Sequence, residues 1–414
     1  MLSIIIPVFN KFSLTRGCLE SLQQHSPTVD YEVIVVDNGS SDETPDELDS
    51  CGNSLFPGKF HTIRLDENRN FGPACNVGAL ASKGAYLFFL NNDTVVTPDW
   101  SRPLLDEMKD GVGMAGPLLV YPDSTSPYGE RVQHLGVACM PQLHPTHLYE
   151  FFPAQHPVTK KQRVLQCITG AAMLLPREVF FEAGMFCEEY INGGEDLDLC
   201  VQVRKCGHSI VSAPESRIYH LQSQTPGRHL HEKHNAQVLK KRCLKDLYPD
   251  FHYHVEKDGY ELALNEHVLP YAKLPERRLR VVQRVFLRES DLPDEDACLE
   301  MMSREPLFFP AYERLAEIMQ TSGAQHRLVS IRFLQTRLFP SRRSGERLVH
   351  AAARAGDAVM EQEGKRICDF YSKLESEDLV GMARDMVEYS KHLNLPSLET
   401  AYTAWIEANN AKTR

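Results

Sequence analysis

The sequence of 414 residues contains no CxxC pair, although it has 11 cysteines. They are scattered from Cys18 to Cys368, and an odd, irregularly spaced set argues against a disulfide framework or a structural zinc ribbon. Long apolar runs are also missing, because Leu2 to Val8 and Tyr86 to Leu90 are far shorter than the ~20 residues that cross a bilayer. The N-terminus lacks a basic stretch followed by an apolar one and a cleavage site. We therefore expect reduced thiols and a cytoplasmic protein, either free in solution or peripheral at the inner face of the membrane.

A surplus of positive charge is absent as well. Lys and Arg total 45 against 56 Asp and Glu, which gives a net charge of −11, so we expect no nucleic acid partner. The hydrophobic share of 42% and the charged share of 24% are those of a globular protein. A chain of this length is expected to form two or three domains.

The first part of the chain alternates between short apolar runs and segments with helical spacing, which predicts a parallel sheet covered by helices. The predicted strands are 2–9, 33–36, 62–65 and 86–90, and the predicted helices are 12–24 and 73–82. Between residues 111 and 219 the pattern is less regular and indicates a mixed sheet with long loops.

Strand signals end at about Leu269, and the later segments have helical periodicity with charged outer faces. We expect a catalytic domain in 1–225, a connecting helical segment in 226–268 and an all-helical domain in 269–414. Residues 309–323 faintly resemble a tetratricopeptide helix pair, without the full 34-residue signature.

Polar residues follow each predicted strand of the first part. In open parallel sheets ligands bind beyond the carboxyl ends of the strands, so these positions are candidate nucleotide contacts. The four segments are Asn10, Asp37 to Asp42, Asn68 to Gly72 and Asn91 to Asp93.

Two of these segments leave alternatives open. Asp37 is suited to a ribose diol or a base imide, but a turn or a helix cap explains its segment equally well. Asp93 ends the most apolar strand, where a cation or a tight cap must compensate its charge. None of these strand ends carries GxGxxG or GxxxxGK[ST], which disfavours oxidoreductases and kinases.

Several segments together resemble the family 2 glycosyltransferases, inverting enzymes with the GT-A fold, and in particular their rhamnosyltransferase-like branch. The similar segments occur in the family's order and cover about residues 1–225. They are SIIIPVFN, VIVVDNGSSDET, ENRNFGPACNVGA, YLFFLNNDTVVTPDW, ITGAAMLLPREVFFEAGMF and GGEDLDLCVQVRKCG with RIYH behind it.

The resemblance implies a nucleoside pocket bordered by Pro7, Val8, Asp37 and Asn38, with further donor contacts nearby. The remaining residues on the nucleotide and donor side are Asn10, Asn70, Gly72, Asn76, Asn91 and Asn92.

A metal site is implied by Asn91-Asn92-Asp93, which stands in the place of the family's DxD motif. Asp93 would hold Mn²⁺ or Mg²⁺ between the two donor phosphates, and His220 matches the position of a further ligand in several relatives. Asn91 replaces the usual first acidic residue, so the protein offers the cation one negative charge fewer. His229, His231 and His234 mimic a zinc cluster, but we expect an exposed loop or helix there.

The acidic segment from Glu195 to Asp198 opens a predicted helix. By resemblance, Asp196 is the general base that deprotonates the acceptor hydroxyl, and Glu195 is the second candidate. For Asp198 we expect a structural role at the helix N-terminus.

The sequence therefore predicts an inverting transfer of a sugar from a UDP- or dTDP-sugar to a hydroxyl group. The acceptor would be a saccharide, a lipid-linked sugar or a protein in bacterial surface polysaccharide or glycoprotein synthesis. A nucleotidyltransferase is disfavoured because PVFNKFS is not a Gly-rich basic loop. The alternative is a catalytically weak binding or scaffold protein, and the helical region would bind a protein partner, the acceptor or a second copy.

Overall fold

The computed structural model describes residues 1–122, 127–221, 228–288 and 293–410. Its first part is a ten-stranded mixed sheet with a main path in the order β10-β12-β6-β11-β4-β1-β2-β3. Strands β1 to β4 are parallel neighbours, and β11 runs antiparallel between β4 and β6. The strands are β1 (Leu2–Val8), β2 (Tyr31–Asp37), β3 (Phe60–Arg64), β4 (Tyr86–Leu90), β5 (Thr94–Val96), β6 (Val112–Val120), β7 (Val132–His134), β10 (Val164–Leu165), β11 (Ala172–Pro176) and β12 (Ser209–His220).

Helices cover both faces of this sheet, because alternate residues of a strand point to opposite sides. Ile4 and Ile6 of β1 pack with Leu19 of α1, whereas Ile5 packs with Ala79 of α3 on the other face. The covering helices are α1 (Phe12–Gln24), α2 (Thr44–Leu55), α3 (Phe71–Ala81), α4 (Ser101–Asp106), α5 (Arg177–Glu182) and α6 (Glu195–Lys205). The approach of α3 to the sheet needs Gly78, since a Cβ there would lie 2.5 Å from Cγ2 of Ile5.

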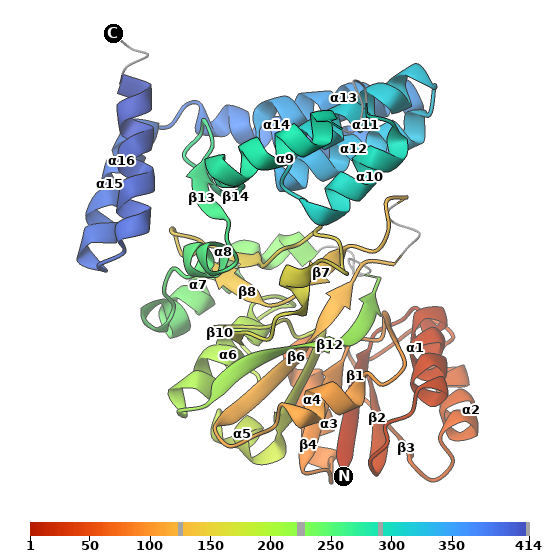
Figure 1. Ribbon diagram of the computed structural model, residues 1–414. Coiled ribbons are helices and arrows are strands. Elements are labelled where there is room, and N and C mark those ends of the chain that lie inside the picture. Colours follow the sequence, from red (N-terminus) through yellow and green to blue (C-terminus); the bar gives the residue numbers. More distant parts are fainter. Residues whose placement is uncertain (123–126, 222–227, 289–292, 411–414) are drawn as a thin grey trace.

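A region of about 150 residues after the sheet is mainly helical, and it lies beyond the end of the sheet towards which β6 and β12 run (Figure 1). Together with the mixed sheet it confirms the predicted fold class. Its helices are α9 (Glu276–Arg288), α10 (Glu295–Arg304), α11 (Phe309–Thr321), α12 (Gln325–Leu338), α13 (Arg342–Ala355), α14 (Ala358–Leu374), α15 (Leu379–His392) and α16 (Pro396–Asn410). None of the helices in the described ranges has the length and apolar character needed to span a membrane.

The connection between the two parts differs from the sequence prediction. Helices α7 (Glu232–Cys243) and α8 (Phe251–Lys257) are followed by a hairpin of β13 (Glu261–Leu264) and β14 (Pro270–Lys273). The expectations of a wholly helical segment in 226–268 and of no strand from about Leu269 onward are thus wrong. Each strand has four residues and pairs only with the other, so its pattern is too short to be detected.

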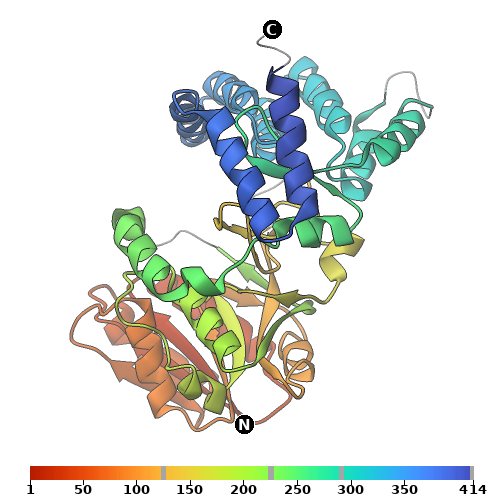
Figure 2. The ribbon, with the colours of Figure 1, turned by 90° about the vertical axis from the view of Figure 1, so that its left-hand side faces the viewer.

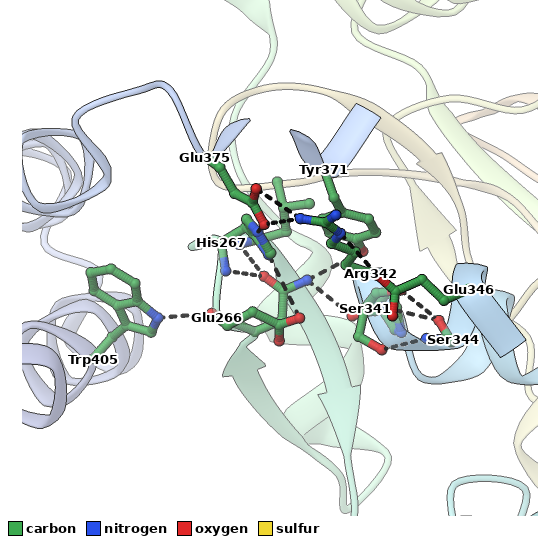
Figure 3. A network of polar contacts seen from close by, with 12 residues as sticks. Glu266, His267, Ser341, Arg342, Ser344, Glu346, Tyr371, Glu375 and Trp405 are labelled. Carbon is green, nitrogen blue, oxygen red and sulfur yellow. Dashed lines mark hydrogen bonds and ion pairs between the residues drawn. The ribbon is translucent and has the colours of Figure 1, made fainter. Parts of the chain in front are cut away.

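The loop of this hairpin is bound by three helices of the following region (Figure 3). The indole N–H of Trp405 donates to the carbonyl of Asn265 at 2.7 Å, and the Asn265 amide donates to the hydroxyl of Tyr371 at 3.3 Å. Arg342 of α13 pairs with Glu375 at 2.7 Å beside the same loop. The side view shows the connecting segment leading into these helices (Figure 2).

The two parts also share one apolar core. A single cluster of buried side chains runs from Met114 of β6 to Leu348 of α13. At the contact, the ring of Phe151 meets that of Phe333 edge to face at 5.5 Å, and the hydroxyl of Tyr128 donates to the Arg327 carbonyl at 2.7 Å. The helices are therefore packed against the sheet part rather than tethered to it. A second small sheet, β8 (Val137–Cys139) with β9 (Pro145–His147), lies between β7 and β10 in the sequence.

Candidate active site

The ends of β1 and β2 are held together by side chains that bind the backbone of neighbouring turns. The side-chain oxygen of Asn10 accepts from the N–H of Ser41 at 2.7 Å, and Asp37 accepts from the N–H of Ser40 at 3.0 Å. Val8 is buried opposite Asp37, and Pro7 is half-buried before it. The Asp37 segment thus forms a turn that its own carboxylate stabilises. Nucleoside contacts from these residues stay a prediction.

Asn38 and Asn70 brace the loop between β3 and α3. The amide nitrogen of Asn38 donates to the carbonyl of Asn70 at 3.1 Å, and its oxygen accepts from the N–H of Arg69 at 2.9 Å. Asn70 has a φ of 69°, and its side chain accepts from the amide of Asn192 at 3.2 Å. The loop after β3 is therefore joined to the loop that precedes α6.

Gly72 and Asn76 of α3 pack against the segment around Phe186. A Cβ on Gly72 would lie 3.2 Å from Cβ of Phe186. The Asn76 amide donates to the Phe186 carbonyl at 2.9 Å and to Glu188 at 3.1 Å, and its oxygen accepts from the Phe186 N–H at 3.0 Å. Since its hydrogen-bonding groups are engaged within the protein, Asn76 is better suited to positioning this segment than to binding a ligand.

Asp93 and His220 come together because β5 and β12 pair with Thr94 opposite His220. Nε2 of His220 lies 3.2 Å from Oδ1 of Asp93 and 3.4 Å from the amide nitrogen of Asn91. Asp93 is 7% exposed, and its Oδ1 has no hydrogen-bond partner among the described residues. The neighbouring Asn92 points away and donates to the hydroxyl of Thr15 at 2.9 Å.

The orientation of the His220 ring is set by Gln133, which the sequence does not reveal. The Gln133 amide nitrogen donates to the His220 carbonyl at 3.0 Å, which directs the Gln133 oxygen to Nδ1 of the ring at 2.6 Å. Nδ1 therefore carries a proton, and Nε2 is the ring nitrogen that faces Asp93. A lone pair and a buried carboxylate oxygen 3.2 Å apart repel each other unless a proton or a cation lies between them.

The Asp93 and His220 pair thus fits a divalent cation with oxygen and imidazole ligands. In the parts of the chain that the structure describes, no group of three or more His, Cys, Asp and Glu is arranged to hold a metal. Two such side chains leave coordination positions for the phosphates of a ligand. The same finding gives no support to zinc at His231 and His234, and the side chain of His229 lies outside the described residues.

Asp196 lies at the start of α6, where the loop after β10 approaches it. One of its carboxylate oxygens accepts from the N–H of Gly170 at 2.9 Å, and the other accepts from the N–H of Leu197 at 2.9 Å. Glu195 is 6% exposed and accepts from the N–H of Gly193 at 2.6 Å, whereas Asp196 is partly exposed. Asp196 is therefore the more accessible of the two candidate bases.

Asp198, one turn into the same helix, has a different environment. Its side chain is 1% exposed and forms an ion pair with Arg242 of α7. It also accepts from the amide of Gln202 at 2.8 Å. The predicted structural role of Asp198 is confirmed.

A buried histidine supports the loop that connects these groups. Nε2 of His134 accepts from the N–H of Thr169 at 3.2 Å. Burial lowers the pKa of His134, and His147 and His220 add to the effect, so the ring is neutral. Two residues further along the loop, the carbonyl of Ala171 accepts from the N–H of Asn91 at 2.9 Å. The segment 169–171 thus lies between the Asp93 site and Asp196.

One protein family and several known proteins are similar to parts of this chain. Residues 3–182 match the model of glycosyl transferase family 2. The chain is 28% identical over 283 residues to the uncharacterized protein y4gI of Sinorhizobium fredii, covering 64% of this chain and 30% of that protein. It is 28% identical to the O-antigen biosynthesis protein RfbC of Myxococcus xanthus, covering 53% of this chain and 17% of that one.

A third relative is the N-acetylglucosaminyl-diphospho-decaprenol L-rhamnosyltransferase of Mycobacterium tuberculosis. It is 25% identical over 229 residues, which are 50% of this chain and 73% of that one. The chain spans less than a third of the length of the first two relatives. Their similarity therefore concerns one part of larger proteins.

Proposed function

Because residues 3–182 form a glycosyl transferase family 2 domain, we propose that the chain transfers a sugar from a nucleoside diphosphate donor to a hydroxyl group with inversion. The donor is a UDP- or dTDP-sugar, and the acceptor is a saccharide, a lipid-linked sugar or a protein. Relatives named for O-antigen biosynthesis and for rhamnosyl transfer support a place in bacterial surface polysaccharide or glycoprotein synthesis. The observation that carries the proposal is the Asp93 and His220 pair at the strand ends, with Asp196 on the neighbouring helix.

The donor side of the reaction depends on Asp93 and His220. These residues would hold Mn²⁺ or Mg²⁺, whose charge offsets that of the departing diphosphate. Gln133 keeps the ring nitrogen of His220 directed at Asp93. Because Asn91 takes the place of an acidic residue, the donor phosphates contribute a large share of the binding of the cation.

The acceptor side depends on Asp196. Its carboxylate takes the proton of the acceptor hydroxyl as the new bond to the anomeric carbon forms, because a neutral hydroxyl is a poor nucleophile. The N–H groups of Gly170 and Leu197 fix the carboxylate in one orientation. Glu195 is the second candidate for this role.

The test is sugar transfer by the purified chain with Mn²⁺ and a panel of UDP- and dTDP-sugars, measured as release of nucleoside diphosphate. We expect Asp93→Ala to lower the rate by roughly 10²–10³-fold. Asp99→Ala is the matched control, since this exposed carboxylate follows β5 and pairs with Arg102. A rate that is equal in wild type and Asp93→Ala contradicts the proposal.

The second candidate is a binding or scaffold protein, favoured by Asn91 at the position of an acidic residue. In that case the chain binds a sugar nucleotide in calorimetry but releases no nucleoside diphosphate with any acceptor. The helical region would then contribute the recognition of a protein partner or of a second copy.

A further inference from the structure

A cavity of about 350 Å³ lies among α11, α12 and α13. These helices are in the upper part of Figure 1, and no residue of the candidate active site lines the cavity. Four arginines line it against one glutamate. The charged and titratable residues in its wall are Arg332, Arg343, Glu346, Arg347, His350 and Arg354.

The basic residues of α13 follow the spacing of one helix face. Arg343, Arg347, His350 and Arg354 are separated by four, three and four positions, so they lie above one another along the cavity. Like charges at this spacing repel and destabilise a helix. The positive charge of this helix face is opposite in sign to the net charge of the chain, which is −11.

Most nearby carboxylates are already engaged. The two oxygens of Glu313 pair with Arg332 and with Arg347. Glu346 pairs at 3.1 Å with Arg342, which also binds Glu375 (Figure 3).

Two cations in the wall are left over. Arg343 and Arg354 form no ion pair within the described ranges. Both side chains are exposed to solvent, and both line the cavity. Their guanidinium groups stay charged at all physiological pH values. The cavity therefore has an uncompensated positive charge.

We propose that this cavity binds a small molecule through a phosphate or diphosphate group. Guanidinium groups match the geometry of phosphate oxygens and bind them with paired hydrogen bonds. The volume is within the range of small-molecule sites. The wall contains no aromatic ring on which a base or a sugar would stack, so the anionic group is the recognised part. The proposal does not depend on glycosyl transfer.

The test is titration of the full chain with inorganic diphosphate by calorimetry, in EDTA and at constant ionic strength. We expect one saturable site, with affinity about tenfold or more weaker in Arg343→Gln/Arg354→Gln. Neither arginine has an ion-pair partner in the described structure, so the double variant strands no carboxylate; circular dichroism checks that it is folded. Arg277→Gln/Arg280→Gln removes the same charge from an exposed face of α9 and should bind as wild type does.

Two further arms identify the source of the ligand and separate this site from the active site. Vesicles containing a polyprenyl diphosphate compete with free diphosphate if the group is lipid-borne and leave its binding unchanged if the ligand is soluble. Asp93→Ala keeps the binding of diphosphate, whatever its effect on sugar transfer. The proposal is overturned by a lack of saturable binding, by an equal loss in the α9 control, by tighter binding of citrate than of diphosphate, or by binding that Asp93→Ala alone removes.

Discussion

In the sheet part, polar side chains near the strand ends mostly bind the backbone of neighbouring loops, whereas in the helical part charged side chains mostly pair with one another. Asn38 and Asn76 are examples of the first kind, and the pairs of Arg337 with Glu363 and of Arg342 with Glu375 are examples of the second. The difference shows where a ligand is to be sought. In the sheet part, a candidate ligand site is marked by a buried oxygen without a hydrogen bond, such as Oδ1 of Asp93. In the helical part, it is marked by an excess of charges of one sign among the ion pairs.

The largest effect is expected in the sheet part, for a change that removes chemistry and keeps the fold. Asp196→Asn should lower the rate of sugar transfer by roughly 10²–10⁴-fold, because an amide cannot accept the acceptor proton. Its thermal unfolding should change little, since the carboxamide oxygen still accepts one of the two backbone N–H groups. Steady-state rates together with thermal unfolding test this. A normal rate in Asp196→Asn with a collapse in Glu195→Gln would move the base to Glu195.

Asp198 sharpens the comparison, since it is an ion-paired residue within the sheet part. Asp198→Ala should lower the free energy of unfolding by about 3 kcal/mol, because it removes a buried carboxylate and leaves Arg242 without its ion-pair partner. Urea denaturation measures the change. Glu300→Ala in the helical part removes an exposed partner of Arg304 and should cost less than about 1 kcal/mol. Equal effects of the two substitutions would contradict the distinction between buried and exposed pairs.

The joint between the parts should respond to pH through Asp258. Burial by itself would raise the pKa of this carboxyl, but hydrogen bonds from Lys161 and Tyr149 and the charge of Arg163 lower it. A folded-state pKa below the unfolded value of about 3.9 stabilises the protein above that pH. The contribution is lost as the pH falls through the folded-state pKa.

Urea denaturation between about pH 6 and pH 2 checks this. The free energy of unfolding should fall on acidification below about pH 4, and less steeply in Asp258→Asn than in wild type. Other carboxyl groups contribute to both curves, so the difference between them is the quantity of interest. Parallel curves would mean that Asp258 has the same pKa in the folded and unfolded chain.

The smallest effect is expected at the hairpin loop held by α14 and α16. Tyr371→Phe removes the hydroxyl that accepts from Asn265 at 3.3 Å, while the Asn265 amide keeps its bond to the Pro340 carbonyl at 2.9 Å. The free energy of unfolding should fall by about 0.5–1 kcal/mol. Tyr253→Phe, at a tyrosine that is 55% exposed, should have no measurable effect in the same denaturation experiment.

Local pattern predicted much of the fold. The segments 12–24 and 86–90 match α1 and β4 at both ends. Both kinds of segment combine apolar periodicity with clear ends. The β13 and β14 hairpin was missed because its register depends on Asn265, whose side chain accepts from the N–H groups of His267 and Leu269 to shape the turn.

The candidate site could be predicted only where a motif marks it. Asp93 and Asp196 lie in such motifs, and the structure places each beside the expected strand end or helix start. Gln133, His134 and Thr169 carry no local signal, since their roles arise from the pairing of β7 with β6 and from a loop that returns to α6. Such partners are selected by tertiary contacts between segments far apart in the sequence.

The apolar cluster that runs from Met114 to Leu348 has a consequence for synthesis of the chain. A ribosome releases the sheet segments first, but Phe151 and its neighbours find their cover only after α12 and α13 have emerged. Until then the nascent sheet part exposes this apolar surface to solvent. In a chain that ends before α12 this surface would stay exposed. We therefore expect the helices to be needed for the yield of folded protein, independently of any role in recognition.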